Sequence, residues 1–316
     1  MDRAGPLADR LTLAVATRLT LAGAAAMLIA AVSTHVLRGE TWLAPGMKVA
    51  ALTERPRECL APAADPRAAR MIAIGRAAFR APLLLGGQAA RSGISCATCH
   101  RSGRSSPAFF LTELSDKPGT ADVTNSLMSS HRDNGVFDPK PIPDLTLPGK
   151  ISRDPASPAL ATFVRGLITE EFDGLPPPPV VFDGLLAYLR ALRACAPDAI
   201  EPITLDAAIA DTEGAMRAAN DTLAMGDRAG ARLLIGAARS ALGDIDERYA
   251  AFAADRAALA AADRKLLALQ QSLDSGTNVA AALAAWRFPP ALALRLRRDA
   301  PRSLYDRATL ARTIPG

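Results

Sequence analysis

The sequence predicts a mainly α fold, with long irregular loops in its middle and an α-helical hairpin or small bundle towards its end. Aromatic residues make up only 4% of the 316 residues, and alanine is abundant, a composition that favours helices over a β-sandwich. Between residues 181 and 195, apolar side chains recur at spacings of four, three, four and three, which buries one continuous face of a helix. A similar alternation runs from residue 242 to residue 266 and predicts further packed helices.

Residues 1–37 have the pattern of an N-terminal membrane anchor. Three arginines, Arg3, Arg10 and Arg18, precede an apolar run over residues 19–37 that contains no Asp, Glu, Lys or Arg. The run is close to the roughly 20 residues that span a bilayer, and arginines of this kind stay on the cytoplasmic side. No clear A-x-A cleavage site follows. We therefore expect an uncleaved transmembrane helix, with a cleaved signal peptide as the alternative.

A linker over residues 38–66 follows, marked by scattered prolines and by no sustained periodicity. The next segment, residues 68–79, places Met71, Ile74 and Ala78 on one stripe of a helix. From residue 80 to residue 179 the chain is rich in Gly, Pro, Ser and Asp. So long an irregular stretch needs a bound group to complete an apolar core.

The most informative motif lies inside this irregular stretch, where Cys96, Ala97, Thr98, Cys99 and His100 spell C-x-x-C-H. This is the attachment signal for a c-type haem: the two thiols form thioethers with the haem vinyl groups, and the adjacent imidazole is the proximal iron ligand. The alternatives are a C-x-x-C redox pair or half of a zinc site. The sequence has no second C-x-x-C to complete a zinc cage, so we expect one covalent haem c.

Further along the chain, Met128 and His131 are alternative candidates for the distal iron ligand. A thioether ligand raises the reduction potential of a haem, and a second imidazole lowers it. An open distal position is the third possibility, and it would suit an enzyme that binds its substrate at the iron.

Other residues near the motif are candidates for contacts with the haem. Arg101, Arg104 and Arg132 flank the motif and the distal segment, and their guanidinium groups suit bidentate pairing with propionates. Pro141 and Pro143 lie in the segment PKPIPD, which we expect to form a rigid wall beside the haem edge.

Residues 197–316 change in composition to Ala, Leu, Arg and Asp and predict a helical extension. Gly226, Gly243 and the pair Ser275-Gly276 are the expected breaks between helices, and Pro289-Pro290 is expected to end the last long one. No cluster of His, Cys or paired carboxylates at ligand spacing occurs there. The net charge of +5 is small for a chain of this length, which argues against a nucleic-acid partner.

Three stretches, GRAAF at 75–79, GISCATCH at 93–100 and LLAYLRAL at 185–192, together resemble the cytochrome c fold. The resemblance is strongest to the N-terminal haem domain of the bacterial di-haem cytochrome c peroxidase and methylamine-utilisation family. It implies a cytochrome c-like haem domain over residues 67–196. It also implies that Gly75 and Phe79 on the first helix pack against Tyr188 on the last helix.

Two departures from that family separate a carrier from an enzyme. The family's enzymes hold two haems with a tryptophan between them, whereas this chain has a single C-x-x-C-H, and Trp42 and Trp286 lie outside the matched region. We therefore expect a membrane-tethered, periplasmic, mono-haem c-type cytochrome in electron transfer with a redox partner protein. The alternative is a peroxidase-like enzyme with an open distal site, and a redox sensor is a third reading.

The resemblance also bears on Cys59 and Cys195, the two cysteines left once the motif has used its pair. Haem attachment takes place outside the cytoplasm, in an oxidising compartment where two remaining thiols tend to form a disulfide. In the resembling fold the helices beside these residues cross. We therefore expect a Cys59–Cys195 disulfide, with two separate thiols as the alternative.

Overall fold

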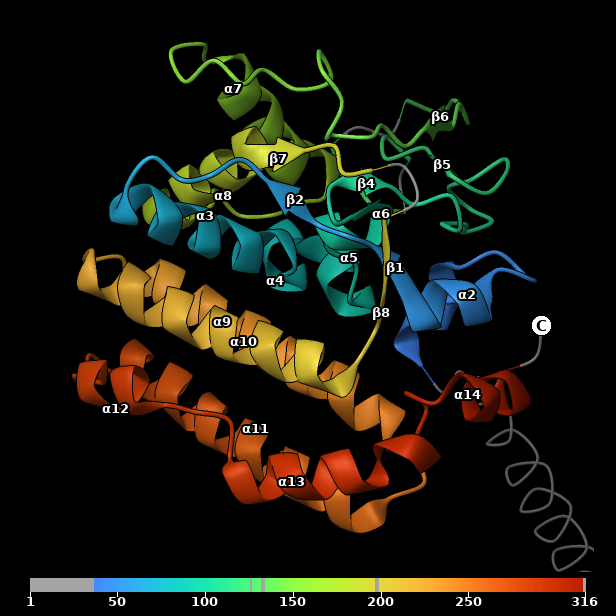
Figure 1. The fold of residues 1–316 in the computed structure, drawn as a ribbon. Helices are drawn as coiled ribbons and strands as arrows, with labels where there is room; N and C mark the ends of the chain where they lie inside the picture. The colour runs from blue at the N-terminus through green and yellow to red at the C-terminus, as the bar shows by residue number, and fades with distance from the viewer. Residues whose placement is uncertain (1–36, 126, 132–133, 197–198, 315–316) are drawn as a thin grey trace, which may run out of the picture. The chain divides into compact units, whose positions relative to one another are not determined.

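The computed structural model of the chain describes residues 37–125, 127–131, 134–196 and 199–314, and residues 36–316 form one compact unit. The described residues are mainly helical, as the composition predicts, and the β-structure consists of short two-stranded pairs (Figure 1). The fold therefore depends on helix packing and on the loops between helices.

The α-helices, in chain order, are α2 (Lys48–Thr53), α3 (Pro66–Phe79), α4 (Pro82–Leu85), α5 (Gly87–Ser92), α6 (Cys96–Cys99), α7 (Ala159–Gly166), α8 (Pro179–Ala191), α9 (Leu205–Ala224), α10 (Arg228–Arg248), α11 (Ala253–Asp274), α12 (Ala280–Ala285), α13 (Pro290–Asp299) and α14 (Arg307–Thr313). Short 3₁₀ helices lie at Arg38–Trp42 and Ala300–Arg302, and a π-helical turn at Leu167–Glu171. The antiparallel strand pairs are β1 (Glu54–Pro56) with β8 (Ile200–Pro202), β2 (Cys59–Leu60) with β7 (Leu192–Arg193), β3 (His100–Arg101) with β4 (Arg104–Ser105), and β5 (Thr120–Ala121) with β6 (Lys140–Pro141).

Helices α3 and α8 cross at a contact between two glycines. A β-carbon added at Gly75 would lie 1.9 Å from the carbonyl oxygen of Gly184, so the two backbones touch. Beside this contact the rings of Phe79 and Tyr188 pack with their centroids 5.2 Å apart. The packing expected of Gly75, Phe79 and Tyr188 is confirmed, and Gly184 completes it from the opposite helix.

The end of α8 differs from the prediction. The apolar stripe suggested a helix as far as Cys195, but α8 ends at Ala191, and the chain continues as strand β7. Leu192 and Arg193 pair with Leu60 and Cys59 of β2. Leu192 still enters the core from this strand, whereas Arg193 is exposed. This pairing brings the α-carbons of Cys59 and Cys195 to 5.6 Å and confirms the expected disulfide.

Helices α9 and α10 form a hairpin that packs against α3 on one side and α11 on the other (Figure 1). The buried apolar side chains of α3, α8, α9 and α10 belong to one continuous core. The extension and the region of the C-x-x-C-H motif therefore share their hydrophobic interior.

The breaks between these helices follow the sequence only in part. Gly226, with a φ of +84°, follows α9, and Gly276, with a φ of +80°, follows α11, as expected. Gly243 was the wrong position for a break, because α10 continues to Arg248 on an apolar face that includes Leu242 and Ile245. The Pro289-Pro290 pair was also misread as an end: Pro290 is the first residue of α13, where its missing N–H costs nothing.

A half-buried ion-pair network joins Glu58, between β1 and β2, to α3, α8 and α9. Glu58 accepts from Arg76 and Arg80 and from the Tyr188 hydroxyl, at 2.5, 3.1 and 2.8 Å, and Asp211 of α9 accepts from the same two arginines at 2.8 and 2.7 Å. Burial alone would raise the pKa of both carboxyls. The surrounding arginines outweigh that effect and hold both pKa values below their ordinary range.

Within the described residues, no helix is long and apolar enough to cross a membrane. Among these residues the expected transmembrane helix and membrane anchor are not found. The segment that suggested it, residues 19–37, lies almost entirely among residues 1–36, outside the described residues.

The glycine crossing predicts a large effect of a single methyl group. Gly75→Ala is expected to lower the free energy of unfolding by about 3 kcal/mol, the upper end of the usual cost of overpacking, because the new β-carbon meets backbone that cannot yield. Gly214→Ala is the control, since its β-carbon would meet only the tip of Arg217 at 3.9 Å. Urea unfolding measures both, and equal effects would contradict the crossing.

The network predicts an acid-dependent contribution to stability. A carboxyl whose pKa is lowered on folding stabilises the fold above its unfolded pKa, here 3.8, and loses that contribution as the pH falls further. Asp211→Asn should therefore cost about 2 kcal/mol at pH 7 and progressively less below about pH 4. Asp206→Asn, on the same helix but in an exposed pair with Arg297, should change stability by less than about 1 kcal/mol. Chemical unfolding at pH 7 and pH 3 separates the two, and a pH-independent cost at Asp211 would refute the linkage.

Candidate functional site

The C-x-x-C segment forms the single helical turn α6. It follows α5 through Gly93, whose φ of +75° reverses the chain, and the Ser95 N–H donates to the Thr98 hydroxyl at 3.1 Å. Residues three apart in a helical turn share a face, so Cys96 and Cys99 point the same way. Both cysteines are half-buried and form no disulfide. The turn thus presents two thiols together to one side.

The protonation of these thiols argues against a redox pair. Burial raises the pKa of Cys96 and of Cys99 to about 12, and Cys96 adds to the effect at Cys99. A reactive C-x-x-C pair instead lowers the pKa of its nucleophilic thiol so that thiolate is present at neutral pH.

His100 follows in strand β3 of a tight hairpin. Ser102 and Gly103 form its two-residue turn with φ values of +53° and +81°, the conformation that such hairpins require. A β-carbon at Gly103 would also lie 2.7 Å from the Leu192 side chain. The hairpin therefore sits directly on the residue where α8 passes into β7.

The imidazole of His100 is held in one tautomer. Its Nδ1 lies 3.0 Å from the carbonyl oxygen of Pro143, and because a carbonyl only accepts, Nδ1 carries the proton and donates it. Burial lowers the pKa of His100 to about 4, so the ring is neutral at pH 7. Its Nε2 therefore has a free lone pair, the form of histidine that binds a metal.

Backbone hydrogen bonds fix the Pro143 carbonyl in place. On one side of it the Ile142 N–H donates to the Gly119 carbonyl at 2.9 Å, and on the other the Leu145 N–H donates to the Gly103 carbonyl at 2.9 Å. The second bond joins the segment directly to the turn of the His100 hairpin. The proline segment, which was expected to form a wall beside the haem, contacts His100 through the Pro143 carbonyl oxygen.

Arg153 holds the continuation of this segment against α8. Its guanidinium donates to four carbonyls within 3.3 Å, those of Leu145, Thr146, Leu147 and Leu192. The Arg153 guanidinium therefore provides, for these loop carbonyls, the hydrogen bonds that a neighbouring strand would otherwise donate.

The two candidate distal ligands lie in different environments. Met128 is 3% exposed and belongs to the hydrophobic core. The His131 side chain is 63% exposed, and its Nε2 lies 3.8 Å from Asp173 Oδ1. The Ser130 N–H and hydroxyl also donate to Asp173, at 2.9 Å each, which holds this end of the loop at the surface.

The flanking arginines are placed differently from one another. Arg104 Nε lies 3.6 Å from Asp144 Oδ2, next to the segment that positions His100. Arg101 lines a cavity that Cys96, Cys99 and His100 do not line. Arg132 lies outside the described residues.

In the described part of the chain no group of three or more His, Cys, Asp and Glu side chains could hold a metal ion. This finding contradicts the expectation of a metal-binding protein as far as a cluster of its own His, Cys, Asp and Glu side chains is concerned. No protein-family model, curated protein or solved structure matches this chain. The chemistry of the site rests on what its residues present: two thiols on one face of a turn and one neutral imidazole with a free Nε2.

Proposed function

We propose that this protein is a mono-haem c-type cytochrome that transfers single electrons, with the haem bound covalently to Cys96 and Cys99. The observation that carries the proposal is the His100–Pro143 hydrogen bond beside two thiols on a shared face. A porphyrin supplies four of the iron's ligands, so one protein imidazole on a C-x-x-C-H segment is sufficient on the proximal side. When bound, the haem iron supplies the chemistry by alternating between ferric and ferrous states.

The packing of the first and last helices of residues 67–196 supports the resemblance to the cytochrome c fold. The glycine of GRAAF and the tyrosine of LLAYLRAL meet where α3 crosses α8, which is the arrangement that the resemblance implies. The disulfide at Cys59 and Cys195 supports an oxidising location such as the periplasm, where c-type haem is also attached. The redox partner is a protein that meets the haem in that compartment.

We assign the distal position to Met128 rather than His131. A thioether in a core that excludes water favours the reduced state of a haem. The exposed imidazole of His131 already has a carboxylate neighbour in Asp173 and would have to leave the surface to reach the iron. Two filled axial positions suit an electron carrier, whereas an enzyme acting on peroxide needs one open.

Haem attachment tests the proposal directly. The Cys96→Ala/Cys99→Ala double variant should lose all haem stain after denaturing electrophoresis, because both thioethers are gone. The matched Cys59→Ala/Cys195→Ala variant should keep the stain. The denatured, unreduced wild-type protein should contain no free thiols, since two sulfurs are in thioethers and two in the disulfide. Haem stain in the first variant would overturn the assignment.

The distal ligand has its own spectroscopic test. Met128→Ala should abolish the weak far-red charge-transfer band of the ferric protein and lower its reduction potential, because a thioether ligand raises the potential. His131→Ala should change neither. The reverse pattern would give the position to His131, and a high-spin ferric spectrum of the wild type with rapid peroxide turnover would favour the enzyme.

A further inference from the structure

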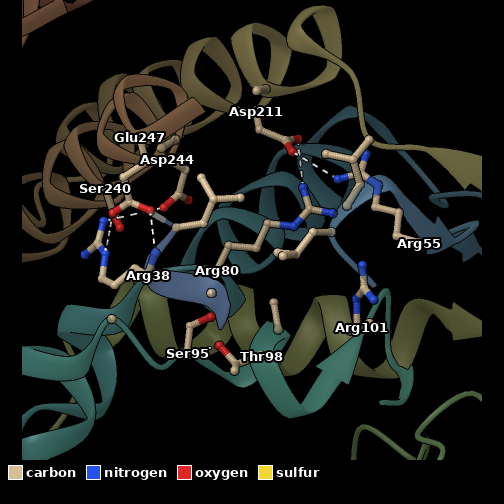
Figure 2. A pocket seen from close by; sticks show the side chains of 18 of the residues that line it. Arg38, Arg55, Arg80, Ser95, Thr98, Arg101, Asp211, Ser240, Asp244 and Glu247 are labelled. Atoms are coloured by element: carbon tan, nitrogen blue, oxygen red, sulfur yellow. Dashed lines mark hydrogen bonds and ion pairs between the residues drawn. The ribbon is translucent and has the colours of Figure 1, made fainter. Parts of the chain in front are cut away.

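A cavity of about 330 Å³ lies behind α6, on the side away from the two thiols. Ser95, Ala97, Thr98 and Arg101 line it from the motif segment, and residues of α9 and α10 line it from the extension. Figure 2 shows the Ser95 and Thr98 hydroxyls and several guanidinium groups around this space. Its volume is that of a site for a small molecule.

Five arginines and three carboxylates line the cavity, and every one of the carboxylates already has an arginine partner. Asp211 pairs with Arg80 at 2.7 Å. Glu247 and Asp244 lie 2.9 and 3.5 Å from Arg38. Glu247 and Asp244 share Arg38, and burial raises the pKa of Asp244 to about 6.

Two of the arginines, Arg101 and Arg248, have no carboxylate within ion-pair distance among the described residues. Arg101 donates to the Glu54 carbonyl at 2.7 Å. Arg248 donates to the carbonyls of Leu52 and Leu304 at 2.7 and 2.8 Å and is only 8% exposed. Backbone carbonyls satisfy the hydrogen bonds of both guanidinium groups. Asp244 and Glu247 partly offset the charge of Arg248 without contacting it, but the wall as a whole keeps two more guanidinium groups than carboxylates.

Arg55, Arg101 and Arg248 line the same cavity. An anion held between these groups would form charge-assisted hydrogen bonds with them.

We propose that this cavity binds a small dianion that carries carboxylate or phosphate groups. Arg101 and Arg248 supply the charge, and guanidinium groups match the two oxygens of either ligand group in a bidentate way. The hydroxyls of Ser95 and Thr98, on the same segment as Arg101, supply neutral donors. The proposal does not depend on the haem, because none of these side chains belongs to the thiols or the imidazole of the motif.

Isothermal titration calorimetry on the purified full-length protein at low ionic strength tests it, with inorganic phosphate, succinate and the neutral analogue succinamide as probes. Phosphate or succinate should bind with one-to-one stoichiometry, and succinamide should not. The stronger of the two anions identifies which chemistry the site prefers.

Variants separate this site from general attraction to a basic surface. Arg101→Gln should weaken anion binding at least tenfold, whereas Arg101→Lys, which keeps the charge but not the fork of donors, should weaken it less. Arg91→Gln is the matched control, because Arg91 is exposed on α5 and bonded only to Gln88; it should bind as the wild type does. Circular dichroism confirms that each variant is folded. The absence of anion binding by the wild type, or equal losses in Arg101→Gln and Arg91→Gln, would overturn the proposal.

Discussion

The contact between Gly75 and Gly184 is the constraint on which the rest of the molecule depends. Because no side chain separates α3 from α8 at this point, the two helices are close enough for the Phe79 and Tyr188 rings to meet. Tyr188 in turn donates to Glu58, which belongs to the ion-pair network that reaches α9. The same helix α8 leads into Leu192, on which the turn of the His100 hairpin rests. One backbone contact therefore sets both the join to the extension and the support of the candidate site.

The candidate site is built from loops, and its order comes from backbone carbonyls. In the described parts of the long segment between His100 and α7, the regular structure consists of two-residue strands. The N–H groups of Ile142 and Leu145, on either side of Pro143, donate to the carbonyls of Gly119 and Gly103. The Arg153 guanidinium holds the segment to Leu192 of β7, directly after α8. Each hydrogen bond of this kind contributes about 1 kcal/mol, so their number and their convergence matter more than any one of them. The imidazole is thereby held in a single tautomer by main-chain atoms alone.

The sequence predicted features that depend on residue type, and it failed where backbone geometry decides. The C-x-x-C-H motif and the helix stripes could be read from residue type and spacing. The partner of Cys59 followed from the two cysteines left over together with the resemblance to the cytochrome c fold. The hydrogen bond from His100 to the Pro143 carbonyl could not be predicted. Every residue has a carbonyl, and only the fold determines which one accepts from the imidazole. Proline and glycine both misled. Pro290 begins a helix, because the first helical position does not need an N–H. Gly243 continues one, because neighbouring apolar positions outweigh its local preference. The role of Gly184 was not predicted, because a glycine inside a helix is recognised as a contact point only when the helix that packs against it is known.

The disulfide between Cys59 and Cys195 has a consequence for how the chain is made. Synthesis proceeds from the N-terminus, so Cys59 exists together with Cys96 and Cys99 well before Cys195 is added. Four cysteines allow three pairings, and the two wrong partners of Cys59 are available first. The correct bond also needs β2 to pair with β7, and it joins cysteines 136 residues apart in the sequence, a long-range contact that is slow to form. Oxidation that runs ahead of folding would therefore trap misbridged chains, and the timing of thiol chemistry during maturation becomes part of what this fold requires.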